Sequence, residues 1–320
     1  MKIAFLGSDR IAIPCLEALL QSEVFCEICG VLTQPDRRSG RGQKFQPNPV
    51  KKWSCDRGIP LIEPDHLGTQ EILWLKERKA DLTLIMAYGH ILSDDFLNAT
   101  PCGCFNLHAS LLPKYRGASP VETALAMGER ETGVTLMRVI PRMDAGPVVD
   151  TELVPILSTD CGTSLREKLS LACVPLILRS ISDLFSQNFL ETNQKDEQAT
   201  YCRKLTKEDG RLDFSLTAHE IECRSRAFSD WPGTWFLHNQ VRLKVGKLRV
   251  CESETSLQPG EREFKKIETL IIGTAEGTIE ILELQKPGGK MLPISDFLRG
   301  YSIPGKISFS LPSKSIPLVR

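Results

Sequence analysis

The sequence lacks several features that would assign a chain to a partner or a compartment directly. It has no excess of charge of either sign, with 40 basic and 40 acidic side chains. No overall basic character therefore indicates a nucleic-acid partner, and any such partner would have to meet a local patch. The N-terminus has an apolar run of only four residues, Ile3–Leu6, which is too short for a signal peptide or a membrane span. We expect a cytoplasmic protein with no membrane partner.

Common nucleotide-binding and nucleophile motifs are also missing. Gly7 is not followed by the later glycines of G-x-G-x-x-G, and no G-x-x-x-x-G-K-S/T is present. No serine lies in a G-x-S-x-G elbow, and no cysteine lies in a recognised nucleophile setting. A dinucleotide enzyme, a phosphate-loop NTPase and a serine hydrolase are therefore poorly supported.

The cysteines are numerous but do not form a metal pattern. There are 11 of them, an odd number, so complete internal disulfide pairing is impossible. Cys26 and Cys29 form a C-x-x-C within a predicted strand, where residues three apart point to opposite faces and cannot chelate one ion. Since no second pair completes a four-ligand set, we expect no metal site.

The chain of 320 residues is long for one compact domain, and its pattern of predicted secondary structure changes along its length. Strands alternate with helices over residues 1–189, which predicts an α/β domain with a doubly wound, mainly parallel sheet. The composition turns wholly polar around Glu191–Ala199, and residues 190–206 are predicted to be a linker. Short alternating segments in 207–320 predict a small antiparallel barrel or sandwich. The predicted strands of the first domain are 2–6, 24–32, 80–87, 104–108, 133–140 and 148–155, and its predicted helices are 11–21, 120–127 and 164–185.

The strand predicted at 104–108 carries two polar side chains on one face, because Asn106 and His108 are two residues apart. Ligands of open parallel sheets bind at the carboxyl ends of the strands, where this pair lies. Asp144 follows the strand predicted at 133–140, and a carboxylate beside a histidine holds the ring's tautomer and favours its charged form. An amide and an imidazolium aimed at one point can stabilise a developing oxyanion. A site that has these groups but no nucleophile suits acyl transfer to an incoming amine. The alternative is structural: a histidine bonded to a neighbouring carbonyl and an asparagine in a turn.

These residues also carry a family resemblance. Asn106-x-His108, the run from Ser110 to Gly117 and the Asp144-x-Gly146 turn resemble the 10-formyltetrahydrofolate-dependent formyltransferases. The similarity continues through residues 33–53, 87–92, 131–149, 204–214, 224–236 and 284–300, so it covers nearly the whole chain. The catalytic residues alone specify only the superfamily, whereas residues 33–53 and the C-terminal domain are similar to those of the member that acts on tRNA.

The resemblance implies a Rossmann-like formyltransferase domain and a C-terminal domain like an oligonucleotide-binding (OB) barrel. It implies transfer of formyl from 10-formyltetrahydrofolate to the α-amine of methionyl-initiator tRNA, for translation initiation, with no metal. The implied catalytic residues are Asn106, His108 and Asp144. The implied folate-contacting residues are Ser110, Leu111, Leu112, Pro113, Tyr88, Gly89, His90 and Ile91. His90 stands where an aliphatic residue is commoner, which leaves the polarity of the pocket open.

The tRNA partner would have to be met by local charge. Residues 33–58 carry seven basic residues against two acidic ones, and Pro35, Pro47 and Pro49 are expected to keep the segment out of regular structure. Residues 201–250 carry ten basic residues against six acidic ones, on the predicted barrel. The predicted tRNA-binding residues are Arg37, Arg38, Arg41 and Lys44. A solvated basic loop is the alternative.

Several other functions remain open at this point. A sister formyltransferase acting on a small amine, such as glycinamide ribonucleotide or an amino-sugar nucleotide, would share the catalytic residues. A formyl-folate hydrolase would share them too, and a tRNA-binding module with a decayed site is the alternative from a different class. We expect a monomer, although the sequence does not determine the oligomeric state.

Overall fold

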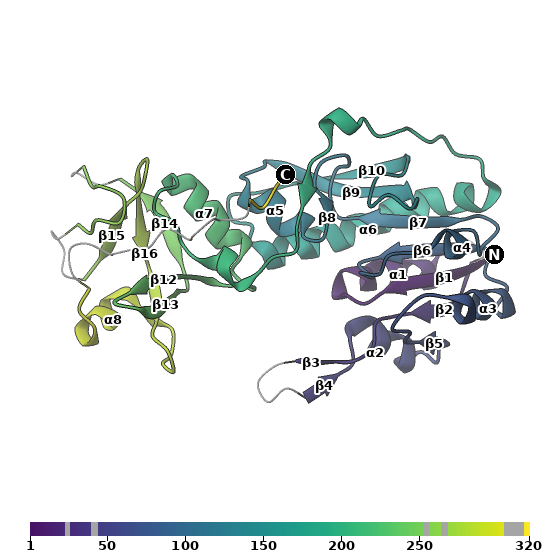
Figure 1. Cartoon of the computed structure of the whole chain (residues 1–320), viewed down its shortest axis with the longest axis horizontal. Helices are drawn as coiled ribbons and strands as arrows, with labels where there is room; N and C mark the ends of the chain where they lie inside the picture. The colour runs from purple at the N-terminus through teal and green to yellow at the C-terminus, as the bar shows by residue number, and fades with distance from the viewer. Residues whose placement is uncertain (23–25, 40–43, 253–255, 264–267, 304–316) are drawn as a thin grey trace. The chain divides into compact units, whose positions relative to one another are not determined.

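The structure, a computed structural model, describes residues 1–22, 26–39, 44–252, 256–263, 268–303 and 317–320. The chain forms two compact units (Figure 1). The first comprises Met1–Pro120, Glu131–Pro155 and Arg166–Cys202. The second comprises Val121–Arg130, Ile156–Leu165 and Arg203–Arg320.

The first unit is built on a seven-stranded sheet with strand order β10-β9-β7-β6-β1-β2-β5. Its strands are β1 (Lys2–Gly7), β2 (Glu27–Leu32), β5 (Leu61–Ile62), β6 (Leu82–Met86), β7 (Cys104–His108), β9 (Glu131–Arg138) and β10 (Val148–Pro155). The five strands from β5 to β7 run parallel, while β9 and β10 pair antiparallel at one edge. β6 is buried at every position, as a strand covered on both faces must be. The predicted mainly parallel α/β sheet is confirmed.

The helices that begin or end in this unit follow the strands along the chain. They are η1 (Arg10–Ala12), α1 (Ile13–Gln21), α2 (Pro49–Asp56), α3 (Thr69–Glu77), α4 (Asp94–Leu97), α5 (Pro120–Ala126), α6 (Gly162–Ser186) and η2 (Asp196–Gln198). The helix predicted at 11–21 is split, because the Asp9 carboxylate accepts from the Ile11 amide at 3.0 Å and caps η1 before α1 begins. The strand predicted at 24–32 begins outside the described residues, and β2 covers its remainder.

The helix α6 is long and apolar enough, by length and composition alone, to span a membrane. Its buried side chains recur at helical spacing within the first unit, at Leu169, Cys173, Leu176, Ile177, Ile181 and Leu184. This stripe is the pattern of a helix that packs one face on a protein core.

The basic segment contains more regular structure than its prolines suggested. Arg37–Ser39 (β3) pairs with Lys44–Gln46 (β4) in a short antiparallel hairpin, and α2 begins at Pro49. The expectation of an irregular segment was therefore wrong. Proline fits the first helical position, where its missing N–H has no helical partner, and the Asn48 side chain caps the helix by accepting from the Lys51 amide at 3.0 Å.

Two further short strands belong to the first unit. β8 (Arg116–Gly117) pairs in parallel with β11 (Tyr201–Cys202). The polar stretch that precedes β11 is hydrogen-bonded to the first unit, because Thr192 forms an isolated β-bridge with Val148 at the start of β10. Residues 191–202 therefore lie against the loops that follow β7 and β9.

The second unit is antiparallel, as predicted for the C-terminal domain. A four-stranded sheet has the order β12 (Thr234–His238), β13 (Val241–Val245), β17 (Glu283–Gln285) and β18 (Leu292–Pro293). A three-stranded sheet has the order β14 (Leu248–Cys251), β16 (Thr278–Ile281) and β15 (Leu270–Gly273). The helical elements are η3 (Lys207–Gly210), α7 (Ala218–Ala227) and α8 (Ile294–Gly300).

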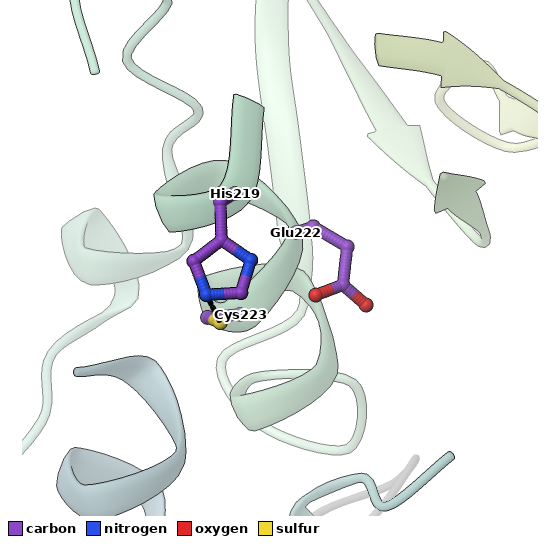
Figure 2. A group of neighbouring side chains, drawn as sticks. All are labelled: His219, Glu222 and Cys223. Carbon is purple, nitrogen blue, oxygen red and sulfur yellow. Dashed lines mark hydrogen bonds between the residues drawn. The ribbon is translucent and has the colours of Figure 1, made fainter. Parts of the chain in front are cut away.

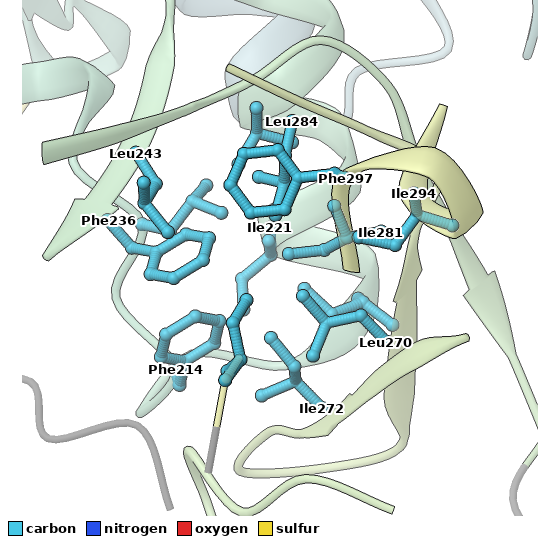
Figure 3. Close-up of a cluster of buried hydrophobic side chains, with 14 of the residues drawn as sticks. Phe214, Ile221, Phe236, Leu243, Leu270, Ile272, Ile281, Leu284, Ile294 and Phe297 are labelled. Atoms are coloured by element: carbon cyan, nitrogen blue, oxygen red, sulfur yellow. The ribbon is translucent and has the colours of Figure 1, made fainter. Parts of the chain in front are cut away.

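One apolar core serves both of these sheets. Phe214, Ile221 from α7, Phe236 from β12, Ile281 from β16 and Phe297 from α8 converge in it (Figure 3). Each of them is at most 3% exposed. Burial of such side chains contributes roughly 1.5–3 kcal/mol each, so the core gives this unit stability of its own.

Candidate functional site

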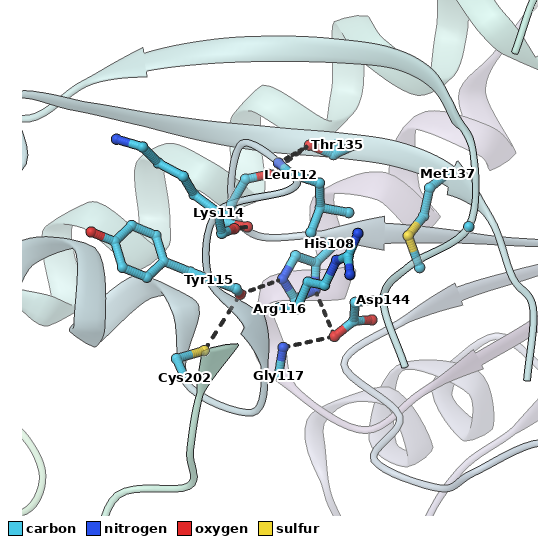
Figure 4. A network of polar contacts seen from close by, with 12 residues as sticks. His108, Leu112, Lys114, Tyr115, Arg116, Gly117, Thr135, Met137, Asp144 and Cys202 are labelled. Atoms are coloured by element: carbon cyan, nitrogen blue, oxygen red, sulfur yellow. Dashed lines mark hydrogen bonds and ion pairs between the residues drawn. The ribbon is translucent and has the colours of Figure 1, made fainter. Parts of the chain in front are cut away.

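His108 ends β7, and its imidazole is buried between two oxygen acceptors (Figure 4). Nε2 lies 3.0 Å from the backbone oxygen of Tyr115, and Nδ1 lies 3.7 Å from Oδ2 of Asp144. The first distance is a hydrogen bond, whereas the second is an ion-pair contact longer than one. Because a carbonyl cannot donate, Nε2 carries the proton of that bond. The Asp144 carboxylate faces the other ring nitrogen, so both ring nitrogens face oxygen acceptors.

Asp144 lies in the loop after β9 and has its carboxylate fixed by backbone. Its Oδ2 accepts a hydrogen bond from the Gly117 amide at 2.8 Å, so the oxygen that faces His108 is also the one that is held. The backbone of Asp144 is in the left-handed region, with φ of 49°, which costs energy for a residue other than glycine. At Gly146 a Cβ would lie 1.8 Å from the Arg138 carbonyl oxygen, so this turn requires glycine.

Asn106 lies on β7 between β6 and β9, paired with Ile85 and Met137. Its side chain is partly buried and forms no hydrogen bond within the part of the chain that the structure describes. Strand alternation places it on the same face as His108. The structure therefore brings His108 and Asp144 into direct contact and leaves the Asn106 amide available two residues before the histidine.

The turn from Ser110 to Gly117 is held by the buried hydroxyl of Thr135 on β9. This hydroxyl donates to the Ser110 carbonyl at 2.6 Å and accepts from the Leu112 amide at 3.1 Å. The Ser110 hydroxyl in turn donates to the Lys114 carbonyl at 2.6 Å. The predicted folate segment Ser110–Pro113 is therefore a fixed turn that follows β7 directly.

The other predicted folate segment follows β6 at the same edge of the sheet. Ala87 has φ of 51° and Gly89 has φ of 83°, so the chain turns sharply here. The Tyr88 ring is buried, and its hydroxyl is without a hydrogen-bond partner among the described residues. The Tyr88 carbonyl accepts from the Gln34 side-chain amide at 2.7 Å. Burial raises the pKa of Tyr88 well above its ordinary value, so the hydroxyl keeps its proton within the apolar core that also contains Leu75 and Phe96.

The two remaining residues of that segment differ in exposure. The His90 ring lies 5.0 Å from the Tyr88 ring, whereas the Ile91 side chain is 91% exposed. Burial lowers the pKa of His90, and the neighbouring His66 and Arg37 lower it further. His90 is thus favoured as a neutral ring at physiological pH.

The predicted tRNA-binding residues fall in the β3–β4 hairpin. Arg37 is exposed at the start of β3. Arg38 and Lys44 belong to the two strands, while their side chains and the whole of Arg41 lie outside the described residues. The backbone thus places three of the four on one hairpin.

Sequence reasoning missed the role of Arg116 and of the residues that surround it. Its guanidinium is fully buried and bonds to Gln194, Asp196 and Tyr201, which are 78 to 85 positions further along the chain. Gln194 also donates to two carbonyls of the loop that carries Asp144. The only signal in the sequence was that Arg116 belongs to the Ser110–Gly117 run, since no pattern in the polar stretch indicates such distant contacts.

A separate cluster of metal-ligand side chains lies on α7, formed by His219, Glu222 and Cys223 (Figure 2). Their ligand atoms lie within 4.8 Å of one another. However, the Arg226 guanidinium donates to Glu222 Oε1 at 2.6 Å and to Cys223 Sγ at 3.5 Å. Burial raises the pKa of the Cys223 thiol, which disfavours the thiolate that a metal requires. The Arg226 cation thus already lies against two of the three side chains, and its contact with Glu222 is an ion pair.

Two family profiles match the chain. Residues 1–180 match the family described as formyl transferase, and residues 204–302 match the formyl transferase C-terminal domain. A methionyl-tRNA formyltransferase from Methylococcus capsulatus is 36% identical over 96% of this chain and 99% of its own length. One from Thermus thermophilus is also 36% identical, over 95% of this chain and 97% of its own length.

Solved structures agree on the fold at lower identity. An N-formyltransferase from Helicobacter canadensis, solved with folinic acid and dTDP-3-aminofucose, has a TM-score of 0.66 and 21% identity. The alignment covers 89% of this chain and 99% of that one. A 4-N formyltransferase from Francisella tularensis has a TM-score of 0.61 and 17% identity, covering 77% of this chain and 96% of that one. At such identities the likeness shows a shared fold.

The methionyl-tRNA formyltransferases match across both units at an identity well above that of these solved structures. The chain belongs to the folate-dependent formyl transferase family and, within it, to the methionyl-tRNA formyltransferases.

Proposed function

We propose that the chain transfers a formyl group from 10-formyltetrahydrofolate to the α-amine of methionyl-initiator tRNA, for translation initiation. The observation that carries this proposal is the 36% identity to methionyl-tRNA formyltransferases across nearly the full length of both chains. The contact between His108 and Asp144 at the carboxyl edge of the sheet supplies groups of the right chemistry.

The reaction sets two requirements for the protein. The neutral amine attacks the formyl carbon, a new C–N bond forms, and negative charge builds on the formyl oxygen. The bond to folate N10 then breaks, and the proton lost by the amine ends on N10. The site must therefore stabilise an oxyanion and assist one proton transfer.

Asn106 is the proposed hydrogen-bond donor to the oxyanion. Its amide is partly buried, has two N–H groups and has no hydrogen-bond partner among the described residues, so a substrate oxygen does not have to displace one. Loss of one such donor costs typically about 10²–10³ in rate.

His108 is proposed to contribute positive charge, with Asp144 keeping it oriented and cationic. In this geometry both ring nitrogens face protein oxygens, so the ring acts on the oxyanion through its charge. A direct hydrogen bond from Nε2 to substrate would require the bond to the Tyr115 carbonyl to open. Asp144 is also placed to take part in moving the amine's proton toward N10, through His108 or water.

The folate is a co-substrate, and two loops are proposed to hold it. Ser110, Leu111, Leu112 and Pro113 form one loop, and Tyr88, Gly89, His90 and Ile91 form the other. The second loop would contact the ligand through its backbone groups, since the chain turns sharply between the left-handed residues Ala87 and Gly89. We propose no role for a metal.

The tRNA is proposed to contact the hairpin through Arg37, Arg38, Arg41 and Lys44, and to contact the C-terminal domain. We propose a catalytic domain of residues 1–189, a connecting stretch of 190–206 and an OB-like tRNA-binding domain of 207–320. The chain is proposed to act as a monomer in the cytoplasm. Contacts of this kind are mainly electrostatic, so the affinity for tRNA should fall as the salt concentration rises.

A comparison of acceptors tests the function directly. The purified chain is incubated with 10-formyltetrahydrofolate and, in parallel, with methionyl-initiator tRNA, glycinamide ribonucleotide or an amino-sugar nucleotide. Formyl transfer to the tRNA alone is expected. Preferred transfer to a small amine, or hydrolysis of the folate without transfer, would overturn the proposal, and tRNA binding without any transfer would indicate a binding module.

A further inference from the structure

Gln194 lies at the centre of a hydrogen-bond network that reaches the catalytic loop. Its Nε2 donates to the Asp144 carbonyl at 2.9 Å and to the Gly146 carbonyl at 2.7 Å. Its Oε1 accepts from Arg116 Nε at 3.0 Å and from Arg116 Nη2 at 2.8 Å. Both amide hydrogens and the carbonyl oxygen are therefore used.

The surroundings allow only one orientation of this amide. A flipped Gln194 would place its oxygen against the two carbonyls of the Asp144 loop and its NH₂ group against a guanidinium, so every contact would become repulsive. Gln194 therefore links Arg116 to the Asp144 loop. Its oxygen accepts hydrogen bonds from the guanidinium, and its NH₂ group donates to two loop carbonyls that the guanidinium does not bond directly.

Arg116 is suited to anchor this network because it cannot move without losing several partners. It is fully buried, and its Nη1 bonds to Asp196 Oδ1 and to the Tyr201 hydroxyl, each at 3.0 Å. The next residue, Gly117, donates its amide to Asp144 Oδ2. The short strand β8 therefore holds Asp144 in two ways. Gly117 bonds the Asp144 carboxylate directly, and Arg116 holds the Asp144 backbone carbonyl through Gln194.

Asp144 needs this support because its left-handed backbone is unfavourable for a residue with a Cβ. Such conformations persist only where the surroundings fix them. The carboxylate must at the same time stay within ion-pair distance of His108. We propose that Gln194 and Arg116 are positioning residues for formyl transfer, which hold the Asp144 loop so that its carboxylate faces His108. This inference rests on the proposed function for its kinetic consequences only.

Gln194→Glu tests the link between Arg116 and the Asp144 loop with almost no change in side-chain shape. The variant keeps an acceptor for Arg116 but replaces the two donated bonds with an oxygen that faces two carbonyls. We expect kcat to fall about 10- to 100-fold, because small displacements of a catalytic group cost this much. The KM values for folate and tRNA should stay within about threefold of the wild type. Gln194→Met, which keeps the length and removes all of the hydrogen bonds, should act in the same direction.

Lys195→Ala is the matched control, since Lys195 is the adjacent exposed residue and its side chain makes no hydrogen bond or ion pair with the described residues. It should match the wild type in kcat and both KM values. Equal kcat for Gln194→Glu and Lys195→Ala would overturn the inference. A rise in KM without a fall in kcat would do so as well, because it would place Gln194 in substrate binding.

A double-mutant cycle separates positioning from general damage to the fold. If Gln194 acts through Asp144, then Gln194→Glu should lower kcat much less in an Asp144→Ala background than in the wild type. A full, additive loss in that background would show that the two residues act independently and would contradict the inference.

A second readout does not depend on the reaction. In protein labelled with ¹⁵N at histidine, the ring-nitrogen resonances of His108, assigned with His108→Gln, should shift in Gln194→Glu and stay unchanged in Lys195→Ala. Unchanged resonances in Gln194→Glu would overturn the positioning role whatever the substrate is. Wild-type protein that fails to formylate methionyl-tRNA while the resonances shift as expected would instead count against the proposed function.

Discussion

The buried hydroxyl of Thr135 gives a sharp test of how the folate turn is held. Thr135→Val keeps the shape of the side chain but removes the bond donated to the Ser110 carbonyl and the bond accepted from the Leu112 amide. Each buried polar group that is left unpaired costs about 1–3 kcal/mol. The Leu112 amide is only partly buried, so we expect a combined loss of about 2–4 kcal/mol in the free energy of unfolding.

Thr132→Val is the matched control on the same strand. Thr132 is buried on β9 as well, at 3% exposed, but its hydroxyl forms no hydrogen bond with the described residues. At about 2–4 °C per kcal/mol, the Tm of Thr135→Val should lie roughly 5–15 °C below that of the wild type. The Tm of Thr132→Val should differ from that of the wild type by about 2 °C or less. The KM for folate should rise in Thr135→Val alone. Equal Tm values for the two variants would refute the reasoning that this hydroxyl fixes the turn.

Three further predictions address backbone strain, pH and charge. Gly117 has φ of 122° and its Cβ would meet a backbone oxygen at 2.1 Å, so Gly117→Ala should cost more than about 3 kcal/mol in urea unfolding. Gly58→Ala, with φ of 65° and open space, should cost about 1 kcal/mol, and similar costs for the two would be evidence against the close approach. The Thr217 amide and hydroxyl hold the pKa of Glu220 below its ordinary value, so its ionised form stabilises the fold. The stability advantage over Glu220→Gln should be present at pH 7 and disappear as the pH falls below about 4, and an advantage that persists at low pH would contradict this sign. Arg41→Ala should weaken formylation of tRNA much more than folate binding, by a margin that shrinks with added salt, whereas equal losses would place Arg41 outside the tRNA contact.

Local patterns were enough to predict the sheet and the strand that carries Asn106 and His108. The continuous apolar run of β6 and the alternation of β7 placed Asn106 and His108 at the carboxyl edge, and both strands are present there. The strand β10 has the bounds predicted from the sequence. Such features depend on residues that are neighbours in the chain, which is why periodicity indicates them.

Contacts between distant residues were not predictable in the same way. The Arg116–Gln194 pair joins positions 78 apart, and the polar sequence around Gln194 is typical of a solvent-exposed linker. Pro49 was interpreted as a breaker because proline disrupts helix interiors, whereas its position next to the capping Asn48 makes it a helix start. The first outcome depends on a distant partner that the local pattern does not specify, whereas the second depends on a capping signal in the sequence that was given too little weight.

Single-turnover formyl transfer by Asn106→Ala tests the central claim most directly. The claim is that a free amide on β7 and the His108–Asp144 pair together stabilise the charge that builds on the formyl oxygen. The predicted result is a transfer rate about 10²–10³ lower than that of the wild type, with the dissociation constants for folate and tRNA unchanged within about threefold. A rate close to that of the wild type, with binding intact, would contradict the claim.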